Sequence, residues 1–275
     1  MKYSYYIDNK KFFISLDILN RFKSGKDEIL SKKFNDIVLD KPWGKRGYTI
    51  KKIFSDNEFK KISSNLKSLF IDFLKKKGID CANFQLAKYH EFVDDKIHQD
   101  LFKYTRRLYP KDFKISINRI VQKIEKICKC KLSFFNPISK NTQWIIIRII
   151  RPSSTDYNPV HKDIYEVYDY YNKIPKMINC WIPICGQAKN GLPVVPYSHL
   201  LNEKYILRTK AGSYINKKKY SVNTIKSWQG KHNLSTKSPK TNEALIFSSH
   251  IIHGLGVNRK KNTTRISFEL RLFEN

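Results

Sequence analysis

The sequence has few acidic residues, little glycine and no long apolar run. Only 24 aspartates and glutamates stand against 53 lysines and arginines, so the formal net charge is +29. The longest apolar run, residues 144–150, is short and contains Arg148, which argues against a membrane-spanning helix. Residues 1–5 lack the apolar stretch of a secretory signal peptide, so we expect a cytoplasmic protein without a membrane partner.

The chain also has too few cysteines for disulfide bonds to hold the fold together. The five cysteines are an odd number without the spacing of a disulfide framework, which favours a reducing compartment. Cys128 and Cys130 form a CxC pair, but no second pair completes a tetrahedral zinc site. We therefore expect free thiols.

The excess of positive charge raises the prior for nucleic acid or an anionic substrate. The lysines are nevertheless spread along the chain in short runs such as 75–77 and 217–219, and Lys, Asn, Ile, Tyr and Phe are all abundant, as in an AT-rich coding sequence. Charge alone therefore does not indicate a specific nucleic-acid surface. Hydrophobic residues make up 41% of the chain, which is a globular composition.

The first half of the chain, about residues 1–130, is predicted to be helical. Ser55 and Glu58 have the spacing of a capping box, apolar residues then recur at helical spacing, and Gly78 is a typical helix end. We expect a second helix between residues 85 and 108 and a third after Pro110. Their apolar stripes indicate packing against a sheet.

The second half, about residues 131–275, is predicted to form strands. The strand candidates are residues 131–135, 143–150, 177–184, 192–195, 244–247 and 265–273. Antiparallel strands after a helical half predict a single α+β domain over residues 1–275, with a β-barrel or sandwich core and helices outside. The basic segment of about residues 200–240 is expected to be a long loop that covers a binding site, and Arg148, Arg151, Tyr165 and Trp228 are candidates for the walls of that site.

Two HxD triplets could contribute a histidine and an aspartate to a metal site. Residues i and i+2 point to the same side of a strand but diverge on a helix. His98 and Asp100 lie in a stretch with a polar helical pattern, so we expect His98 to be a solvated surface histidine. His161 and Asp163 follow Pro159 in a segment that can be extended, and they are the better chelating pair.

A second histidine is needed to complete this pair. Two imidazoles and one carboxylate leave metal positions open, as suits a non-haem Fe(II) oxygenase. We favour His253, which follows the strand at 244–247 and precedes Gly254. His250 stays the competing ligand, or a group outside the ligand set.

Arg265 and Ser267 are two residues apart on a predicted strand and therefore share a face. A guanidinium beside a hydroxyl can hold a carboxylate, which is what anchoring the distal end of 2-oxoglutarate requires. The row that continues to Glu269 and Arg271 either faces solvent or lines a polar cavity, and its place after His253 favours the cavity.

Several motifs in order resemble the phytanoyl-CoA dioxygenase family. Residues 46–50 followed by 54–58 are similar to the family's opening glycine-tyrosine, strand and capped helix, and residues 179–184 resemble its tryptophan-bearing strand. Residues 191–199, GLPVVPYSH, are similar to the signature G-x-L-x-V-V-P-G-S-H, with Tyr197 where glycine is usual.

The resemblance implies a double-stranded β-helix (jelly-roll) core with the N-terminal helices packed outside. It implies Fe(II) bound by His161, Asp163 and His253, and 2-oxoglutarate anchored by Arg265 with help from Ser267. Asn179 would lie near the co-substrate, and His199 would shape its loop. The implied activity is that of a dioxygenase that uses O2 to hydroxylate a small polar or anionic organic substrate.

Two alternatives come from other observations. Arg265 and Arg271 have an R-x5-R spacing like that of AlkB-type nucleic-acid dealkylases, and the charge fits phosphate contacts. Nucleic acid is not the favoured partner, because residues 191–199 resemble the other family. The alternative from another class is a cupin-like protein that binds or isomerises a ligand without oxidation.

Overall fold

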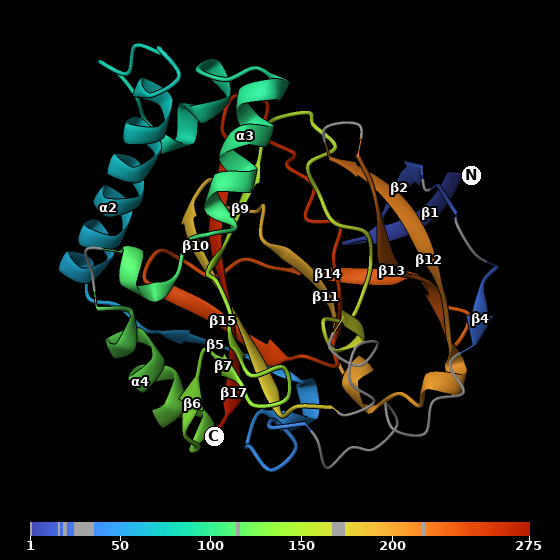
Figure 1. Cartoon of the computed structure of the whole chain (residues 1–275). Coiled ribbons are helices and arrows are strands. Elements are labelled where there is room, and N and C mark those ends of the chain that lie inside the picture. Colours follow the sequence, from blue (N-terminus) through green and yellow to red (C-terminus); the bar gives the residue numbers. More distant parts are fainter. Residues whose placement is uncertain are drawn as a thin grey trace.

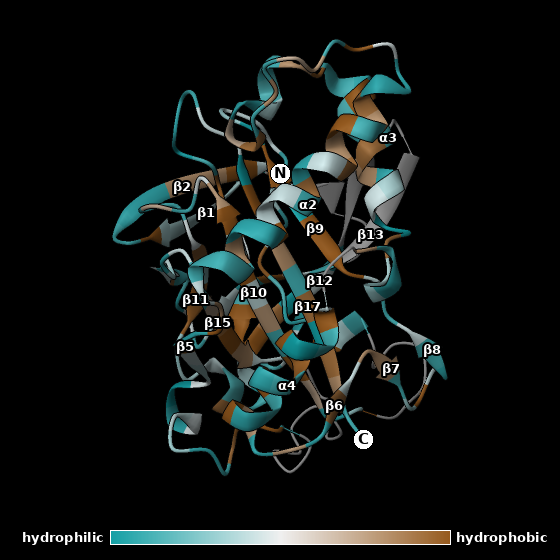
Figure 2. Ribbon diagram, turned by 90° about the vertical axis from the view of Figure 1, so that its left-hand side faces the viewer, coloured by the Kyte–Doolittle hydropathy of each residue, from teal (hydrophilic) through white to brown (hydrophobic). Residues whose placement is uncertain are grey.

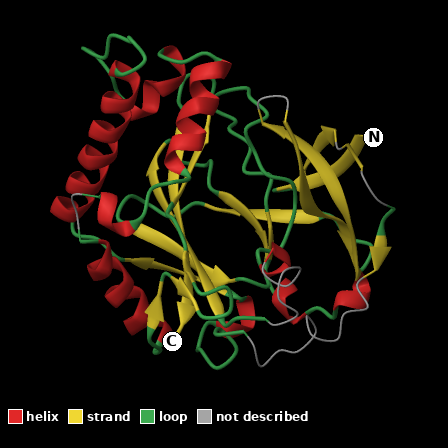
Figure 3. Ribbon diagram, viewed as in Figure 1, coloured by secondary structure: helices red, strands yellow, loops and turns green. Residues whose placement is uncertain are grey.

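The computed structural model describes residues 2–15, 17–18, 21–24, 36–113, 116–166, 174–215 and 218–275. Within them, helices cover one face of a large antiparallel sheet and a second sheet lies on its other face (Figures 1 and 3). No described helix is long and apolar enough to cross a membrane. The arrangement is an α+β fold, as predicted.

The major sheet contains the strands that the second half of the sequence predicted. Its members, in spatial order where they follow one path, are β5 (Tyr48–Lys52), β15 (Glu243–Ser248), β10 (Met177–Cys185), β17 (Arg265–Glu274) and β6 (Leu132–Ser133), with β9 (Ile146–Ile150) paired to β17 beside β6. Every pairing within it is antiparallel.

The second sheet faces the inner side of the major sheet. Its order is β16 (Ile252–His253), β11 (Leu192–Val195), β14 (Asn233–Lys237), β1 (Lys2–Ile7) and β2 (Lys10–Ser15). A further sheet contains β13 (Lys218–Trp228), β12 (Ile206–Ile215), β3 (Asp17–Ile18) and β4 (Lys23–Ser24), and β7 (Phe135–Asn136) pairs with β8 (Asn141–Thr142).

The helices cover the outer face of the major sheet (Figure 1). They are α2 (Asp56–Lys75), α3 (Asp95–Thr105) and α4 (Ile117–Cys128), joined by short 3-10 turns. On α2 the residues that recur every four positions, from Ile62 through Leu66 and Phe70 to Leu74, are at most 3% exposed. Figure 2 shows this division, with hydrophobic strands behind helices that turn hydrophilic faces outward.

Strand β17 separates two parts of the interior, the core under the helices and the space between the major and second sheets. Ile266, Phe268 and Leu270 pack into the core under the helices. The alternate residues from Arg265 to Arg271 face the inner side, where Trp181 and Phe247 of the neighbouring strands form a smaller apolar cluster with residues of β11. The predicted period-two pattern of this strand is confirmed.

The amino-terminal residues correct the prediction of a helical first half. Residues 2–15 form the β1–β2 hairpin, and β1 also pairs in parallel with β14. Asp8 and Asn9 adopt positive φ angles of 51° and 64°, which is the backbone of a type I′ hairpin turn. Tyr5 and Ile7 are buried at spacing two. These turn and strand signals were present in the sequence.

The segment of about residues 200–240 also differs from the prediction, because most of it is not a loop. Strands β12 and β13 form a long antiparallel hairpin from Ile206↔Trp228 to Ile215↔Lys218, and β14 follows in the second sheet. The lysine-rich composition concealed these strands, because solvent-facing strand positions tolerate charge as well as loops do. Trp228 belongs to the buried core beside β1 rather than to a binding-site wall.

The start of α2 allows a test of the capping box. The Ser55 hydroxyl accepts a hydrogen bond from the Glu58 amide at 3.3 Å, and the Glu58 carboxylate accepts one from the Ser55 amide at 2.8 Å. We expect Ser55→Ala to lower the free energy of unfolding by about 1 kcal/mol in urea denaturation. Ser68→Ala in the middle of the same helix is the control and should be neutral or slightly stabilising. Equal losses in both variants would contradict the capping role.

Candidate metal centre

Backbone pairing brings the HxD segment to the distant histidine. The amide of His161 donates to the carbonyl of His253 at 2.8 Å, and the amide of His253 donates to the carbonyl of His161 at 3.0 Å. Gly254 follows with φ 139°, and a Cβ there would come 2.4 Å from the carbonyl oxygen of Pro159. This close approach of two chain segments therefore requires glycine.

The three predicted ligand residues meet in the interior. Nε2 of His161 lies 3.4 Å from Oδ1 of Asp163, and Nε2 of His253 lies 3.6 Å from Oδ2. One ligand atom from each residue lies within 4.8 Å of the other two, and all three residues are buried. His250 is not part of this group. The described residues therefore contain a His-Asp-His set that could hold a metal ion.

Both imidazoles are fixed in the form that a metal ligand needs. Nδ1 of His161 lies 2.7 Å from the carbonyl oxygen of Pro159, and Nδ1 of His253 lies 3.1 Å from that of Ile251. Since a carbonyl only accepts, Nδ1 carries the hydrogen and the Nε2 lone pair points to the site. Burial lowers the pKa of His253 to about 4. Burial opposes protonation of His161 too, but hydrogen bonding to Asp163 raises the pKa of His161 above its usual value.

Two donors orient the carboxylate of Asp163. Arg271 lies 2.7 Å from Oδ1, and the Asn179 amide donates to Oδ2 at 2.8 Å. Burial alone would raise the pKa of Asp163, but the charges of Arg271 and His253 hold this pKa well below its usual range. Asn179 therefore contacts a candidate metal ligand, while its predicted contact with the co-substrate stays a prediction.

Lys162, the residue between His161 and Asp163, anchors this segment through a buried ion pair. The fully buried ammonium of Lys162 lies 2.7 Å from Oε1 of Glu203, whose Oε2 accepts a hydrogen bond from Tyr165 at 2.7 Å. Sequence reasoning missed this network and placed Tyr165 in a pocket wall. The role of Lys162 could not be predicted from the HxD triplet, because its partner Glu203 lies 41 residues away in the chain.

Arg265 is buried, and no carboxylate of the described residues forms an ion pair with it. Its guanidinium donates to the backbone carbonyls of Asn190, Gly191 and Gly256, which uses three of its five N–H groups. Nε of Arg265 and Oγ of Ser267 are buried and have no hydrogen-bond partner among the described residues. Burial lowers the pKa of Arg265 to about 10. These are donors placed to receive an anion.

One small cavity connects this guanidinium with the candidate ligands. It is lined by His161, His253 and Arg265, among others, and measures about 30 Å³, while a neighbouring cavity beside Asp163 measures about 20 Å³. Glu269 lines both, and its carboxylate forms a bidentate ion pair with Arg148 at 2.9 and 3.2 Å. Arg148, predicted as a pocket wall, therefore does line the cavity, whereas Arg151 pairs with Asp156 outside it.

Three of the five other histidines, His98, His199 and His250, have structural surroundings. His98 lies on α3, as predicted, but it is buried rather than solvated, with Nδ1 3.1 Å from the Tyr89 hydroxyl and Nε2 3.6 Å from Asp156. His199 contacts the carbonyl of Gly44 through Nε2 at 2.8 Å, in keeping with a loop-shaping role. His250 is buried, and burial lowers its pKa to about 3.

Comparison with known proteins gives structural neighbours only. No family model matches the chain, and no curated protein matches it. The non-haem α-ketoglutarate-dependent carbocyclase SnoK of nogalamycin biosynthesis aligns with a TM-score of 0.43 and 11% identity over 84% of this chain and 81% of its own. The corresponding epimerase SnoN aligns with a TM-score of 0.43 and 11% identity over 84% of this chain and 79% of its own. AviO1 from Streptomyces viridochromogenes Tue57 aligns with a TM-score of 0.43 and 13% identity over 84% of this chain and 90% of its own. Similarity of this size does not define a family, so membership of the phytanoyl-CoA dioxygenase family stays a prediction.

The buried pair behind the ligands gives a stability prediction. We expect Lys162→Met to lower the free energy of unfolding by about 3–5 kcal/mol, because Glu203 is left as an unpaired buried charge. The double variant Lys162→Met/Glu203→Gln should recover most of the loss, because it removes both charges. Lys88→Met, which breaks an exposed pair with Glu91, is the control and should leave the free energy of unfolding nearly unchanged in chemical denaturation. A double variant no more stable than Lys162→Met would contradict this explanation.

Proposed function

We propose that the chain is an Fe(II)/2-oxoglutarate-dependent oxygenase with a jelly-roll core. The observation that supports this most is the shared cavity, which touches the two histidines of a buried His-Asp-His set and a buried guanidinium without a carboxylate partner. A metal ion and an anionic co-substrate would there lie side by side.

The donor set fits Fe(II). Two neutral imidazole nitrogens and one carboxylate are the ligands of non-haem iron oxygenases, and three protein ligands leave coordination positions for other molecules. The outer contacts also fit, because His161 and His253 donate to backbone carbonyls and Asp163 is held by Arg271 and Asn179.

The surroundings of Arg265 fit the distal carboxylate of 2-oxoglutarate. Its Nε and the Ser267 hydroxyl are the unpartnered buried groups on the strand that also carries Arg271. A cavity of about 30 Å³ has the volume of roughly one water molecule, so the dicarboxylate needs more room than the side chains leave. We infer that the ion pair of Arg148 with Glu269 moves to admit it.

The protein's own part in the reaction is to bind, orient and exclude water. When bound, iron with 2-oxoglutarate and O2 would supply the oxidising power for C–H hydroxylation. His161, Asp163 and His253 would hold the metal, and Arg265 with Ser267 would orient the co-substrate. Trp181, Leu192 and Phe247 form an apolar cluster that would keep water from this side of the site.

The favoured substrate is a small polar or anionic organic molecule. The predicted basic loop over the site is mostly strands and does not support this substrate class. The charged side chains of Arg148, Glu269 and Arg271 in the cavity walls support it instead. Arg271 is engaged by Asp163 at 2.7 Å and Glu166 at 2.8 Å. The R-x5-R spacing therefore does not offer a second free guanidinium to a nucleic-acid phosphate.

Metal binding tests the ligand assignment. We expect the metal-free protein to bind Fe(II) or Co(II) anaerobically, and His161→Ala or His253→Ala to weaken the affinity by at least about 100-fold, because each removes a bond to the metal. His250→Ala is the matched control and should bind the metal as the wild type does. The assignment is wrong if His250→Ala loses the metal and His253→Ala keeps it.

Co-substrate binding tests Arg265. We expect 2-oxoglutarate to give a weak visible charge-transfer band with the anaerobic Fe(II) protein, and succinate in the presence of O2 and a suitable substrate. Arg265→Ala should weaken 2-oxoglutarate binding about 10- to 100-fold, through loss of charged hydrogen bonds. Arg259→Ala, which removes a more exposed guanidinium, should leave the band unchanged. Absence of both the band and succinate in the wild type would refute the oxygenase proposal.

A further inference from the structure

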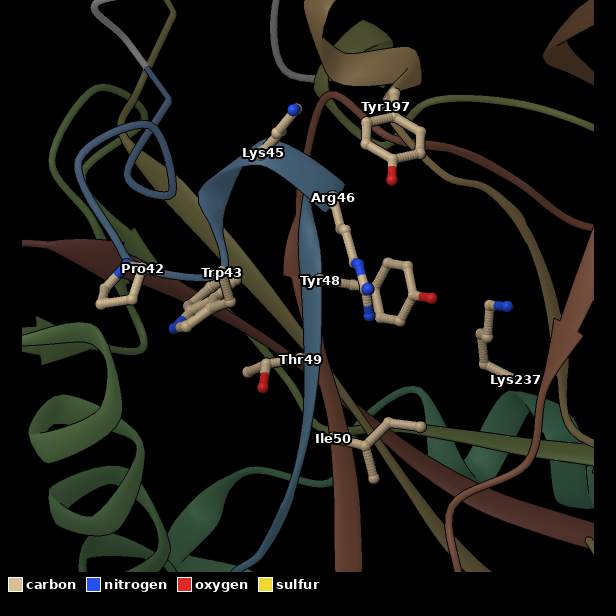
Figure 4. Close-up of a pocket in the computed structure, with 9 residues that line it drawn as sticks. All are labelled: Pro42, Trp43, Lys45, Arg46, Tyr48, Thr49, Ile50, Tyr197 and Lys237. Atoms are coloured by element: carbon tan, nitrogen blue, oxygen red, sulfur yellow. The ribbon is translucent and has the colours of Figure 1, made fainter.

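A large cleft lies at the free edge of the major sheet, away from the candidate metal centre. It has a volume of about 700 Å³, and its described lining residues are Pro42, Trp43, Lys45, Arg46, Tyr48, Thr49, Ile50, Tyr197 and Lys237. Figure 4 shows Arg46, Tyr48, Tyr197 and Lys237 around the opening on one side of β5. Its volume is within the usual range of small-molecule sites.

An apolar layer separates this cleft from the metal ligands. Strand register places Tyr48 opposite Phe247, Phe247 opposite Asn179, and Asn179 opposite Arg271 in one row across the sheet. With strands about 4.8 Å apart, Tyr48 is roughly 10 Å from Asn179, which contacts Asp163. None of the lining residues of the cleft also lines the two small cavities. The cleft is therefore a separate site.

The described lining has positive charge and no carboxylate. Lys45, Arg46 and Lys237 line the cleft, and none of the three forms an ion pair within the described part of the chain. Lys237 instead contacts the Ser235 hydroxyl at 2.8 Å, with its ammonium 5.4 Å from the centre of the Tyr48 ring. The charge of Lys237 acts on the carboxylate of Asp8 outside the cleft, but no described lining residue is acidic, and cations that share a wall without a carboxylate favour an anion.

Tyr197 contributes an exposed aromatic side chain to the wall of the cleft. Its φ is 67°, in the left-handed region that glycine adopts without strain, and its amide is fixed to the carbonyl of Arg46 at 3.1 Å. The side chain is 47% exposed, so packing does not account for a tyrosine at this position. The aligned position of the signature motif has glycine. The ring of Tyr197 is therefore available to stack on a flat group that enters the cleft.

We propose that this cleft binds an anionic small molecule that carries a flat ring. Arg46 and Lys237 pair with its phosphate or carboxylate, and Tyr48 and Tyr197 contact the faces of the ring. The site does not depend on the oxygenase reaction, because it shares no lining residue with the metal centre.

Isothermal titration calorimetry on the full-length, metal-free protein tests this proposal. The probes are adenosine 5′-monophosphate and indole-3-acetate, which combine a flat ring with a phosphate or a carboxylate. Adenosine and ribose 5-phosphate each lack one half. At least one two-part probe should bind, and each single-part probe should bind about tenfold more weakly or not at all.

Variants at the cleft and matched variants outside it locate the binding. Arg46→Ala and Tyr197→Gly should each weaken binding about tenfold, and Tyr197→Gly should not lower the Tm, because glycine relieves the left-handed backbone. Lys51→Ala on the same strand and Tyr205→Ala, a tyrosine of 48% exposure, should bind as the wild type does. The proposal is overturned if neither two-part probe binds, or if Arg46→Ala and Tyr197→Gly bind with unchanged affinity. Neither result would bear on the oxygenase proposal, since no metal is present.

Discussion

The two backbone hydrogen bonds between His161 and His253 hold together segments that are 92 residues apart in the chain. Without this pairing the imidazole of His253 would not lie near His161 and Asp163. Asp163 would then lie beside the charged residues of β17 without the second histidine. The pairing is possible because Gly254 lets its backbone approach Pro159. The candidate metal centre is thus a consequence of main-chain contact first and of side-chain chemistry second.

The interior between the two sheets is divided by strand. On the β5 and β15 side the inward residues are mainly apolar or aromatic, and they pack with β11. On the β10 and β17 side they include Asn179, Glu269 and Arg271, which contact partners of opposite charge or hydrogen-bonding groups, and Ser267, whose buried hydroxyl has no partner among the described residues. The major sheet therefore provides both an apolar wall and a polar wall, and the candidate ligand residues lie where the two walls meet.

Local signals in the sequence predicted local structure well. The capping box at Ser55, the strand at Leu192–Val195 and the alternation along β17 each depend on neighbours within a few residues. The gathering of His161, Asp163 and His253 was predicted from residue type and the order of motifs, and the structure brings the three together. Their role as iron ligands stays a prediction.

Contacts that depend on strand order could not be predicted in this way. The pairing of Arg271 with Asp163 requires β17 to lie beside β10, and that of Arg148 with Glu269 requires β9 on the other side of β17. The buried position of His98 depends on Tyr89 and Asp156, which only the packing of α3 brings near. The strands of residues 200–240 were missed for a different reason, since their charged composition resembles that of a loop.

The unpaired guanidinium of Arg265 has a thermodynamic consequence. Among the more buried groups, Arg271 is balanced by Asp163 and Arg148 by Glu269, so Arg265 leaves one positive charge in excess there, while Glu166, the second partner of Arg271, is about half exposed. A divalent cation that bound alone would increase this excess inside a medium that screens charge poorly, whereas a dianion beside it would reduce the excess. The two would therefore strengthen each other's binding, and by linkage the increase in affinity is the same whichever of them binds first.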